Sequence, residues 1–155
     1  MKSVFVVGVV VASGVLGLWA ETQIWNDAGS DNLWSTNAAN WTDGTVWTNG
    51  NMALFTGNNG TSQGGAIDVD GAVIFSGMRF LTNGYTVADA NNNGTLTLTN
   101  QPNIETVSTV GTTIISEALS GAGGFNKIGA GILQLTASNT YSGVTTVKAG
   151  TLRLS

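Results

Sequence analysis

The sequence predicts an all-β solenoid, in which successive turns of the chain stack on one another as parallel coils. One observation is a pattern of glycine, any residue, apolar, any residue, apolar and hydroxyl, which starts at Gly71, Gly94, Gly111, Gly131 and Gly150. A strand-length pattern that returns about every twenty residues is typical of repeat architectures. The other observation is that no window of a dozen residues has the 3.6-residue period of an amphipathic helix, so we expect essentially no helix in the mature chain.

The composition sets the class of protein and excludes several functions. The chain has 155 residues, of which 9% are charged and 22 are glycine, and its formal net charge is −4. An average soluble domain has about 25% charged residues, so amides and hydroxyls have to make this surface soluble. Lys and Arg number only 5. Because no basic stripe is available to neutralise phosphates, we expect no nucleic-acid partner.

The chain contains no cysteine and no histidine. The first absence removes disulfides, thiolate nucleophiles and zinc–thiolate sites. The second removes Ser-His-Asp and Cys-His arrangements and the commonest transition-metal ligand. We therefore expect no cofactor, no metal and no enzymatic activity, and a fold that is stabilised by stacking rather than by covalent bridges.

Residues 1–20 have the features of a cleavable secretory signal peptide. Lys2 gives the positive start, residues 4–18 form an uncharged apolar run, and Ala20 precedes the predicted cleavage point. The alternative is a retained membrane anchor, but the run is short for a span of about 20 residues and contains glycines. Under either interpretation the rest of the chain leaves the cytoplasm, and we expect no membrane insertion of the mature region.

Residues 21–65 form a Trp- and Asn-rich N-terminal segment with short strands, one of them near residues 52–55, and with dense turn signals towards its end. Its tryptophans have two interpretations. They form a platform that stacks on sugar rings, or they form a cap over the open end of the first coil, where indoles bury large areas. We favour the cap, since buried aromatics are commoner than ligand platforms. The residues are Trp25, Trp34, Trp41 and Trp47.

The best catalytic candidates are Asp68 and Asp70, which lie two residues apart and so share one strand face. Parallel β-helices host enzymes that use clustered carboxylates for calcium binding or acid–base catalysis, and Arg79 is the nearest cation. The simpler interpretation is a solvated strand face. A calcium site is a further hypothesis, although the spacing matches no EF-hand loop. Its residues would be Asp27, Asp31 and Asp43.

Residues 66–155 form the predicted solenoid. The two apolar residues of each pattern share one strand face, and we expect them to point inward. If each period is one coil, equivalent strands stack at about 4.8 Å with leucine over leucine inside and threonine outside. The inward leucines are Leu96, Leu98, Leu133, Leu135, Leu152 and Leu154. Strands are expected near 66–70, 72–76, 78–81, 85–88, 95–99, 104–107, 112–119, 125–128, 132–136, 144–148 and 151–154.

The end of the chain, residues 119–155, resembles the autotransporter-associated β-strand repeat. The likeness rests on Lys127 and on three runs of sequence, which are Gly131-Ile132-Leu133-Gln134-Leu135, Asn139-Thr140-Tyr141 and Ala149-Gly150-Thr151-Leu152. Residues 66–118 look like more divergent coils of the same type. The Trp segment resembles the N-terminal region of large exported bacterial proteins that carry this repeat.

The resemblance implies a right-handed parallel β-helix that is displayed at the bacterial outer surface or shed from it. It also implies a non-catalytic scaffold or adhesin-like passenger, with carbohydrate binding through the tryptophans as the alternative. The structural residues of the repeat are Gly94, Gly131, Tyr141, Gly150 and the inward leucines. No C-terminal translocator barrel is present in the sequence. Export would therefore need a missing C-terminus or another secretion route. Because the chain stops at Ser155 within a repeating strand, we expect a truncated chain, whose partners are further repeats and extracellular glycans or neighbouring cell surfaces.

Overall fold

The computed structural model describes residues 20–27, 31–57 and 64–155, and all but the last residue of the predicted signal peptide lies outside these ranges. Within them the chain contains no α-helix, as predicted, and only one 3-10 turn, η1 (Thr42–Gly44). No helix of the described part is long and apolar enough to cross a membrane. The strands are β1 (Thr22–Trp25), β2 (Leu33–Trp34), β3 (Met52–Phe55), β4 (Ala66–Val69), β5 (Ala72–Phe80), β6 (Thr86–Ala88), β7 (Thr95–Thr106), β8 (Thr112–Ile115), β9 (Leu119–Ser120), β10 (Phe125–Ile128), β11 (Ile132–Leu135), β12 (Thr145–Val147) and β13 (Thr151–Leu154).

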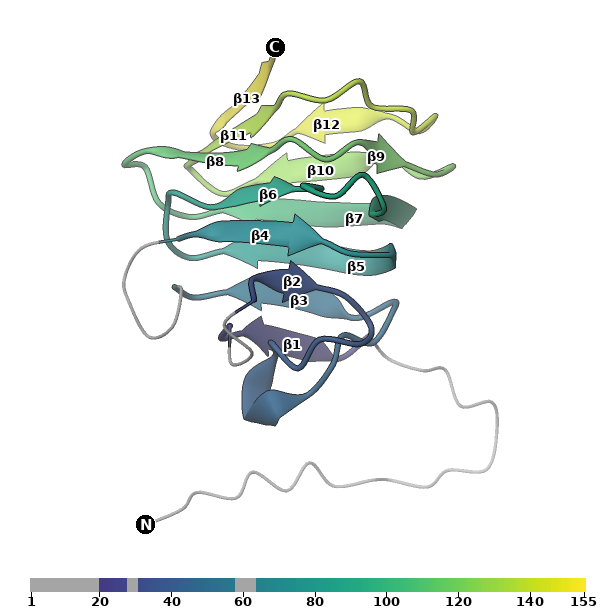
Figure 1. Cartoon of the computed structure of the whole chain (residues 1–155). Helices are drawn as coiled ribbons and strands as arrows, with labels where there is room; N and C mark the ends of the chain where they lie inside the picture. Colours follow the sequence, from purple (N-terminus) through teal and green to yellow (C-terminus); the bar gives the residue numbers. More distant parts are fainter. Residues whose placement is uncertain (1–19, 28–30, 58–63) are drawn as a thin grey trace, which may run out of the picture.

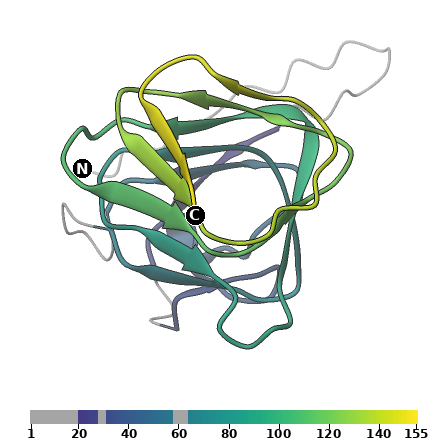
Figure 2. The same cartoon turned by 90° about the horizontal axis from the view of Figure 1, so that it is seen from above.

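The strands pair in parallel and form two sheets. The first sheet has the order β1-β3-β5-β7-β10-β12, with β9 beside β7, and the second has the order β2-β4-β6-β8-β11-β13. Neighbouring strands of a sheet belong to successive turns of the chain. These turns rise from β1 to β13 in Figure 1 and surround a single axis in Figure 2. The predicted solenoid of stacked parallel coils is confirmed.

The long strands β5 and β7 bend and contribute to two faces of the coil. Residues 72–75 of β5 pair with residues 95–98 of β7, and after a shift in register residues 77–80 pair with residues 103–106. The first half of β7 also pairs with β9, and its second half pairs with β10. The predicted strands 72–76 and 78–81 are therefore one strand, and so are 95–99 and 104–107. The predicted strand 112–119 is two strands, because the chain turns a corner between β8 and β9.

The glycine patterns do not form the single stack that one coil per period would give. Those that start at Gly71 and Gly94 lie beside each other on the first sheet, where Ala72 pairs with Thr95. The three that start at Gly111, Gly131 and Gly150 lead into β8, β11 and β13 of the second sheet. The physical reason is that each coil has more than one strand-bearing face. The same turn-and-strand pattern therefore serves more than one of them.

The inward positions of the solenoid carry apolar side chains. Leu96, Leu98, Leu133 and Leu135 are buried, as predicted. In the last coil Leu152 lies in register with Leu133 and packs against the core, but it is only partly buried, and Leu154 is 72% exposed. Leu154 pairs in register with buried Leu135, but among the described residues β13 has a strand neighbour on one side only.

At three of its positions, the first glycine of the repeated pattern lies where two coils approach each other closely. A Cβ atom at position 94 would overlap the backbone carbonyl of Val69, and one at position 131 would overlap that of Ser108. Gly150 makes the same approach to the carbonyls of Gly129 and Gly131, and it also has a φ of +70°. Close packing of successive coils therefore explains the glycine at positions 94, 131 and 150.

Candidate functional site

The four tryptophans form one aromatic cluster in the first coils, and each is 1% exposed or less. Trp25 ends β1, and its ring meets that of Trp41 edge to face at a centroid distance of 5.4 Å. Trp34 of β2 meets Trp47 in the same way at 5.2 Å. The cluster continues into the solenoid core through Phe55, which lies 5.5 Å from Trp34.

Burial of these rings argues against the interpretation of the Trp segment as a sugar-stacking platform. A ring that stacks on a sugar has to expose one face to solvent, and none of the four does. Carbohydrate binding through the tryptophans therefore finds no support. The backbone segments beside the cluster are also hydrogen-bonded to each other. The N–H groups of Asn26 and Asp27 both donate to the carbonyl of Asn40, at 3.0 and 3.1 Å.

A shallow polar depression of about 450 Å³ lies on the outer side of this segment. Its wall contains the carboxylates of Glu21 and Asp43. Gln23 crosses its floor, donating to the carbonyl of Val46 at 2.8 Å and accepting from the N–H of Thr48 at 2.8 Å. The amide groups of the floor thus attach the loop to β1, and they are already occupied by partners within the chain.

Asp68 and Asp70 lie at a corner of the coil, where they hold the turn that follows β6. Asp68 accepts from the N–H of Ala90 at 2.8 Å and from the side chain of Asn91 at 2.9 Å. Asp70 accepts from the side-chain amide of Asn93 at 2.7 Å. Both carboxylates therefore connect one coil to the next.

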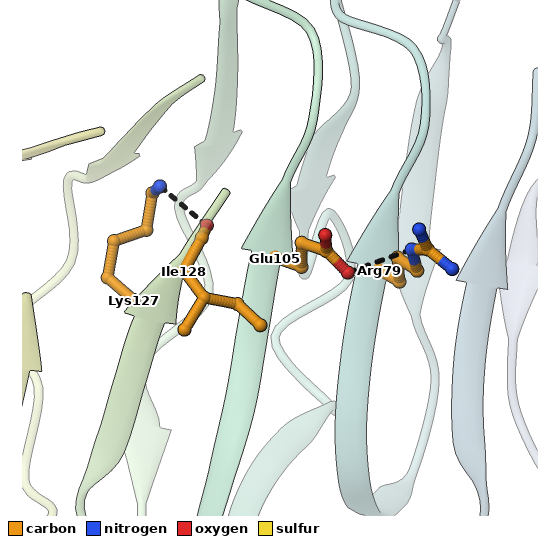
Figure 3. Close-up of polar contacts among 4 residues, drawn as sticks. All are labelled: Arg79, Glu105, Lys127 and Ile128. Atoms are coloured by element: carbon orange, nitrogen blue, oxygen red, sulfur yellow. Dashed lines mark hydrogen bonds and ion pairs between the residues drawn. The ribbon is translucent and has the colours of Figure 1, made fainter. Parts of the chain in front are cut away.

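Arg79 does not lie with these carboxylates. It is on the first sheet, whereas Asp68 is on the second, and its Nε forms an ion pair with Glu105 at 2.8 Å (Figure 3). The structure therefore does not bring Arg79 together with the Asp68–Asp70 pair, as the catalytic hypothesis would have required. Arg79 pairs with Glu105 because the two residues are neighbours across β5 and β7.

Asp89 lies in this turn, the one that follows β6, and stabilises it by hydrogen bonds to its backbone. Its carboxylate accepts from the N–H groups of Asn91 and Asn93 at 3.1 Å and of Gly94 at 2.8 Å. Desolvation opposes ionisation, but these backbone hydrogen bonds outweigh it and lower the pKa of Asp89. Glu117 lies close enough for its charge to interact with that of Asp89. Two effects raise the pKa of Glu117: burial, which is the larger, and repulsion by the charge of Asp89.

The carboxylates of the calcium hypothesis also hold turns. Asp27 accepts from the N–H of Asn32 at 3.1 Å, and Asp31 accepts from the N–H of Leu33 at 3.1 Å and from the side chain of Asn40. Asp43 lies apart from them, on the wall of the polar depression. In the described ranges no three Asp, Glu, His or Cys side chains gather in a group that could hold a metal ion.

The most unusual polar residue is Lys127 in β10, which is 0% exposed. Its Nζ donates to the carbonyl of Ile128 at 2.8 Å (Figure 3). It also donates to the carbonyl of Gly129 at 2.9 Å and to that of Ala149 in the next coil at 3.2 Å. Burial lowers the pKa of Lys127, and the nearby charge of Glu105 opposes this shift. Lys127 thereby joins a tight turn to the coil that follows. The sequence signal for this burial is the position of Lys127 two residues after Phe125, which places both side chains on the inward face of β10.

Tyr141 connects coils in a comparable way. Its ring packs edge to face against Phe125 at 5.7 Å, and its hydroxyl lies 2.6 Å from Oγ1 of Thr145. Two residues earlier, Asn139 accepts from the N–H of Leu119 at 2.9 Å. The Asn-Thr-Tyr run, residues 139–141, therefore connects neighbouring coils through a hydrogen bond and a ring contact.

Comparison with known proteins identifies this arrangement. Residues 125–154, which contain Lys127, Tyr141 and Gly150, match the family model of the passenger-associated-transport-repeat. The chain is 37% identical over 135 residues to the adhesin BmaC autotransporter of Brucella suis biovar 1 (strain 1330). The match covers 80% of this chain and 4% of the adhesin. No solved structure matches the chain. The resemblance to autotransporter passenger repeats is confirmed.

Proposed function

We propose that this chain, which carries the passenger-associated-transport-repeat, is a non-catalytic scaffold segment of an exported autotransporter-type passenger with an adhesin-like surface. The observation that carries the proposal is a core filled by stacked side chains, from the aromatic cluster to Leu133 and Leu135. Several carboxylates of the described part hold turns or ion pairs, and Asp68, Asp89 and Glu105 are examples. With the core filled in this way, a partner would bind to the outer surface of the solenoid.

The proposal includes the parts of the chain that lead out of the cell. Residues 1–20 act as the signal peptide, and the Trp segment caps the first coil, with its loop at residues 40–48 lying across β1. We also propose that the coil is right-handed, because parallel strand–crossover–strand connections are right-handed in about 98% of cases.

Adhesion is proposed by analogy with the Brucella adhesin, and this chain spans only 4% of that protein's length. The outer face of the first sheet supports the idea. There Asn126 donates to Asn103 at 3.1 Å, and the amides of Gln101 and Asn126 lie 3.4 Å apart beside the Arg79–Glu105 pair. We propose neighbouring cell surfaces as the partner, held by many weak polar contacts along this face.

Surface display can be tested because the chain has no cysteine. Val110 is 72% exposed and Leu133 is buried, so Val110→Cys and Leu133→Cys form a matched pair. In intact cells that express the protein, a membrane-impermeant maleimide should label Val110→Cys and leave Leu133→Cys unlabelled until the protein is denatured. Labelling of Val110→Cys only after cell lysis would contradict export to the surface.

A further inference from the structure

Asn-Gly dipeptides recur in the sequence, at residues 49–50, 59–60, 83–84 and 93–94. Such dipeptides undergo a known intramolecular reaction, in which the backbone nitrogen of the glycine attacks the side-chain carbonyl carbon of the asparagine. Glycine favours the reaction because it has no Cβ to hinder the approach. The attack requires a glycine N–H that is free of hydrogen bonds. The dipeptide at 59–60 lies outside the described residues.

The dipeptide Asn49–Gly50 is held at both of its groups. The N–H of Gly50 donates to the carbonyl of Ile74 at 2.8 Å. The side chain of Asn49 accepts from the N–H of Ile74 at 2.8 Å and donates to the carbonyl of Ala72 at 3.1 Å. Neither the attacking nitrogen nor the carbon under attack is free to move.

The dipeptide Asn93–Gly94 is held in an equivalent way by two acidic side chains. The N–H of Gly94 donates to the carboxylate of Asp89 at 2.8 Å. The side chain of Asn93 donates to Asp70 at 2.7 Å. This dipeptide is therefore protected as well, even though Asn93 is exposed.

The dipeptide Asn83–Gly84 differs from both. Gly84 is exposed, has a φ of +80°, and its N–H donates to no residue in the part of the chain that the structure describes. The side chain of Asn83 has one hydrogen bond, from its amide nitrogen to the carbonyl of Val110. That carbonyl belongs to a corner loop in which Val110 is 72% exposed.

We propose that Asn83 is a site of spontaneous deamidation in the folded protein. The nitrogen of Gly84 loses its proton to a solvent base and forms a bond to Cγ of Asn83. The bond from Cγ to the side-chain nitrogen breaks, and ammonia leaves with a proton from solvent. Water then opens the resulting cyclic imide at one of its two carbonyls, which gives aspartate or isoaspartate. The reaction needs no oxidant, metal or enzyme.

The conversion removes the hydrogen bond that holds the corner loop. An aspartate at position 83 presents only acceptor oxygens to the carbonyl of Val110, so attraction becomes repulsion. It also makes the formal net charge, which is −4 in the unmodified chain, more negative by one. An exported protein that persists outside the cell would thus change its surface with age at one position.

The test is peptide mapping by mass spectrometry after incubation of the whole chain at mildly alkaline pH. Asn83 should convert at least about tenfold faster than Asn49 and Asn93. Their glycine N–H groups have to break a hydrogen bond first, and an opening that costs about 1.4 kcal/mol slows the reaction tenfold. Equal rates at the three sites, or a slower rate at Asn83, would overturn the proposal.

Two further measurements separate an effect of the fold from an effect of local sequence. In the urea-unfolded chain the three rates should converge, and a preference for Asn83 that survives unfolding would also overturn the proposal. Asn83→Asp should speed amide hydrogen exchange at residues 108–111, whereas Asn83→Gln, which keeps the amide and the charge, should yield no acidic form at this position.

Discussion

Lys127 shows at the scale of a single residue how successive coils are joined. A buried ammonium group normally needs a carboxylate partner, but this one has three backbone carbonyls, two from its own turn and one from the next coil. The first two carbonyls belong to the tight turn at Gly129, which follows the end of β10. The residue therefore satisfies polar groups that the core could not otherwise accommodate.

Replacing Lys127 with methionine should be costly although the shape is similar. The change removes the donor to three carbonyls, and we expect the free energy of unfolding to fall by about 1–3 kcal/mol. Lys148→Met is the matched control, because Lys148 is exposed and should change stability by less than about 0.5 kcal/mol. Urea titration followed by circular dichroism measures both. Equal effects of the two variants would refute the role of Lys127.

Asp89 gives a pH dependence of known sign. Its pKa is lower in the folded protein than in the unfolded chain, so its stabilisation is present above the unfolded value of about 3.9 and is lost as the pH falls through the folded value. Asp89→Asn should therefore destabilise the protein at neutral pH, with a difference from wild type that shrinks in acid. Thermal unfolding across a pH series measures this difference.

Glu117 provides the control of opposite sign. Burial and then the charge of Asp89 raise the pKa of Glu117, so its ionised form opposes folding at neutral pH. Glu117→Gln should stabilise the protein at neutral pH, and the gain should vanish below the unfolded pKa of about 4.3. Destabilisation by Glu117→Gln at neutral pH would mean that the corner has been misassigned.

At the scale of the strand and turn, the glycine pattern marks places where the chain passes close to the previous coil. Gly94 and Gly71 both begin the pattern, but for different reasons. A side chain at position 94 would strike the carbonyl of Val69, whereas position 71 has open space and a φ of +75°. One glycine is required by packing and the other by backbone conformation.

These two glycines can be compared by the same substitution. Gly71→Ala should cost about 1–2 kcal/mol, because alanine is strained at positive φ. Gly94→Ala should cost more, since two coils have to move apart or the turn has to distort. Chemical denaturation gives both values, and hydrogen exchange at residues 66–70 should increase in Gly94→Ala alone. A larger loss for Gly71→Ala would contradict the close approach at Gly94.

The elements that the sequence could predict are those with a local signal. The alternation in residues 125–128 and 132–135 specifies β10 and β11, because inward and outward positions differ in polarity. The continuity of β5 and β7 through a bend has no such signal, since it depends on which strands of other coils lie alongside. The pairing of Arg79 with Glu105 was missed for the same reason, because it spans two coils.

At the scale of the whole molecule, stability should be distributed along the axis. Strand pairing joins each coil to its neighbours, as expected of a solenoid, so a local loss need not unfold the entire chain. The aromatic cluster with Trp34 lies in the first coils, and Leu135 lies in the last ones (Figure 1). A destabilising substitution at one end of the solenoid should therefore increase local unfolding mostly at that end.

Two core truncations test this distribution. Trp34→Ala and Leu135→Ala each remove a buried side chain and should cost about 3–5 and 2–5 kcal/mol. Hydrogen exchange should rise in β1 to β4 for Trp34→Ala and in β8 to β13 for Leu135→Ala. A uniform rise over all strands in both variants would mean that the chain unfolds as one globular unit.

The central claim is that successive coils lie in the register given by the strand pairs, and cysteine cross-linking tests it most directly. Parallel neighbours lie about 4.8 Å apart, within the Cα range of about 4.4–6.8 Å that a disulfide spans. Asn103 pairs with Asn126 on the first sheet, and Gln134 pairs with Arg153 on the second. In the chain's cysteine-free background, Asn103→Cys with Asn126→Cys, and Gln134→Cys with Arg153→Cys, should each form an intramolecular disulfide under mild oxidation. Asn103→Cys with Thr146→Cys, two coils apart, should not. Failure of both register pairs, or equal cross-linking of the pair two coils apart, would contradict the stacked-coil fold.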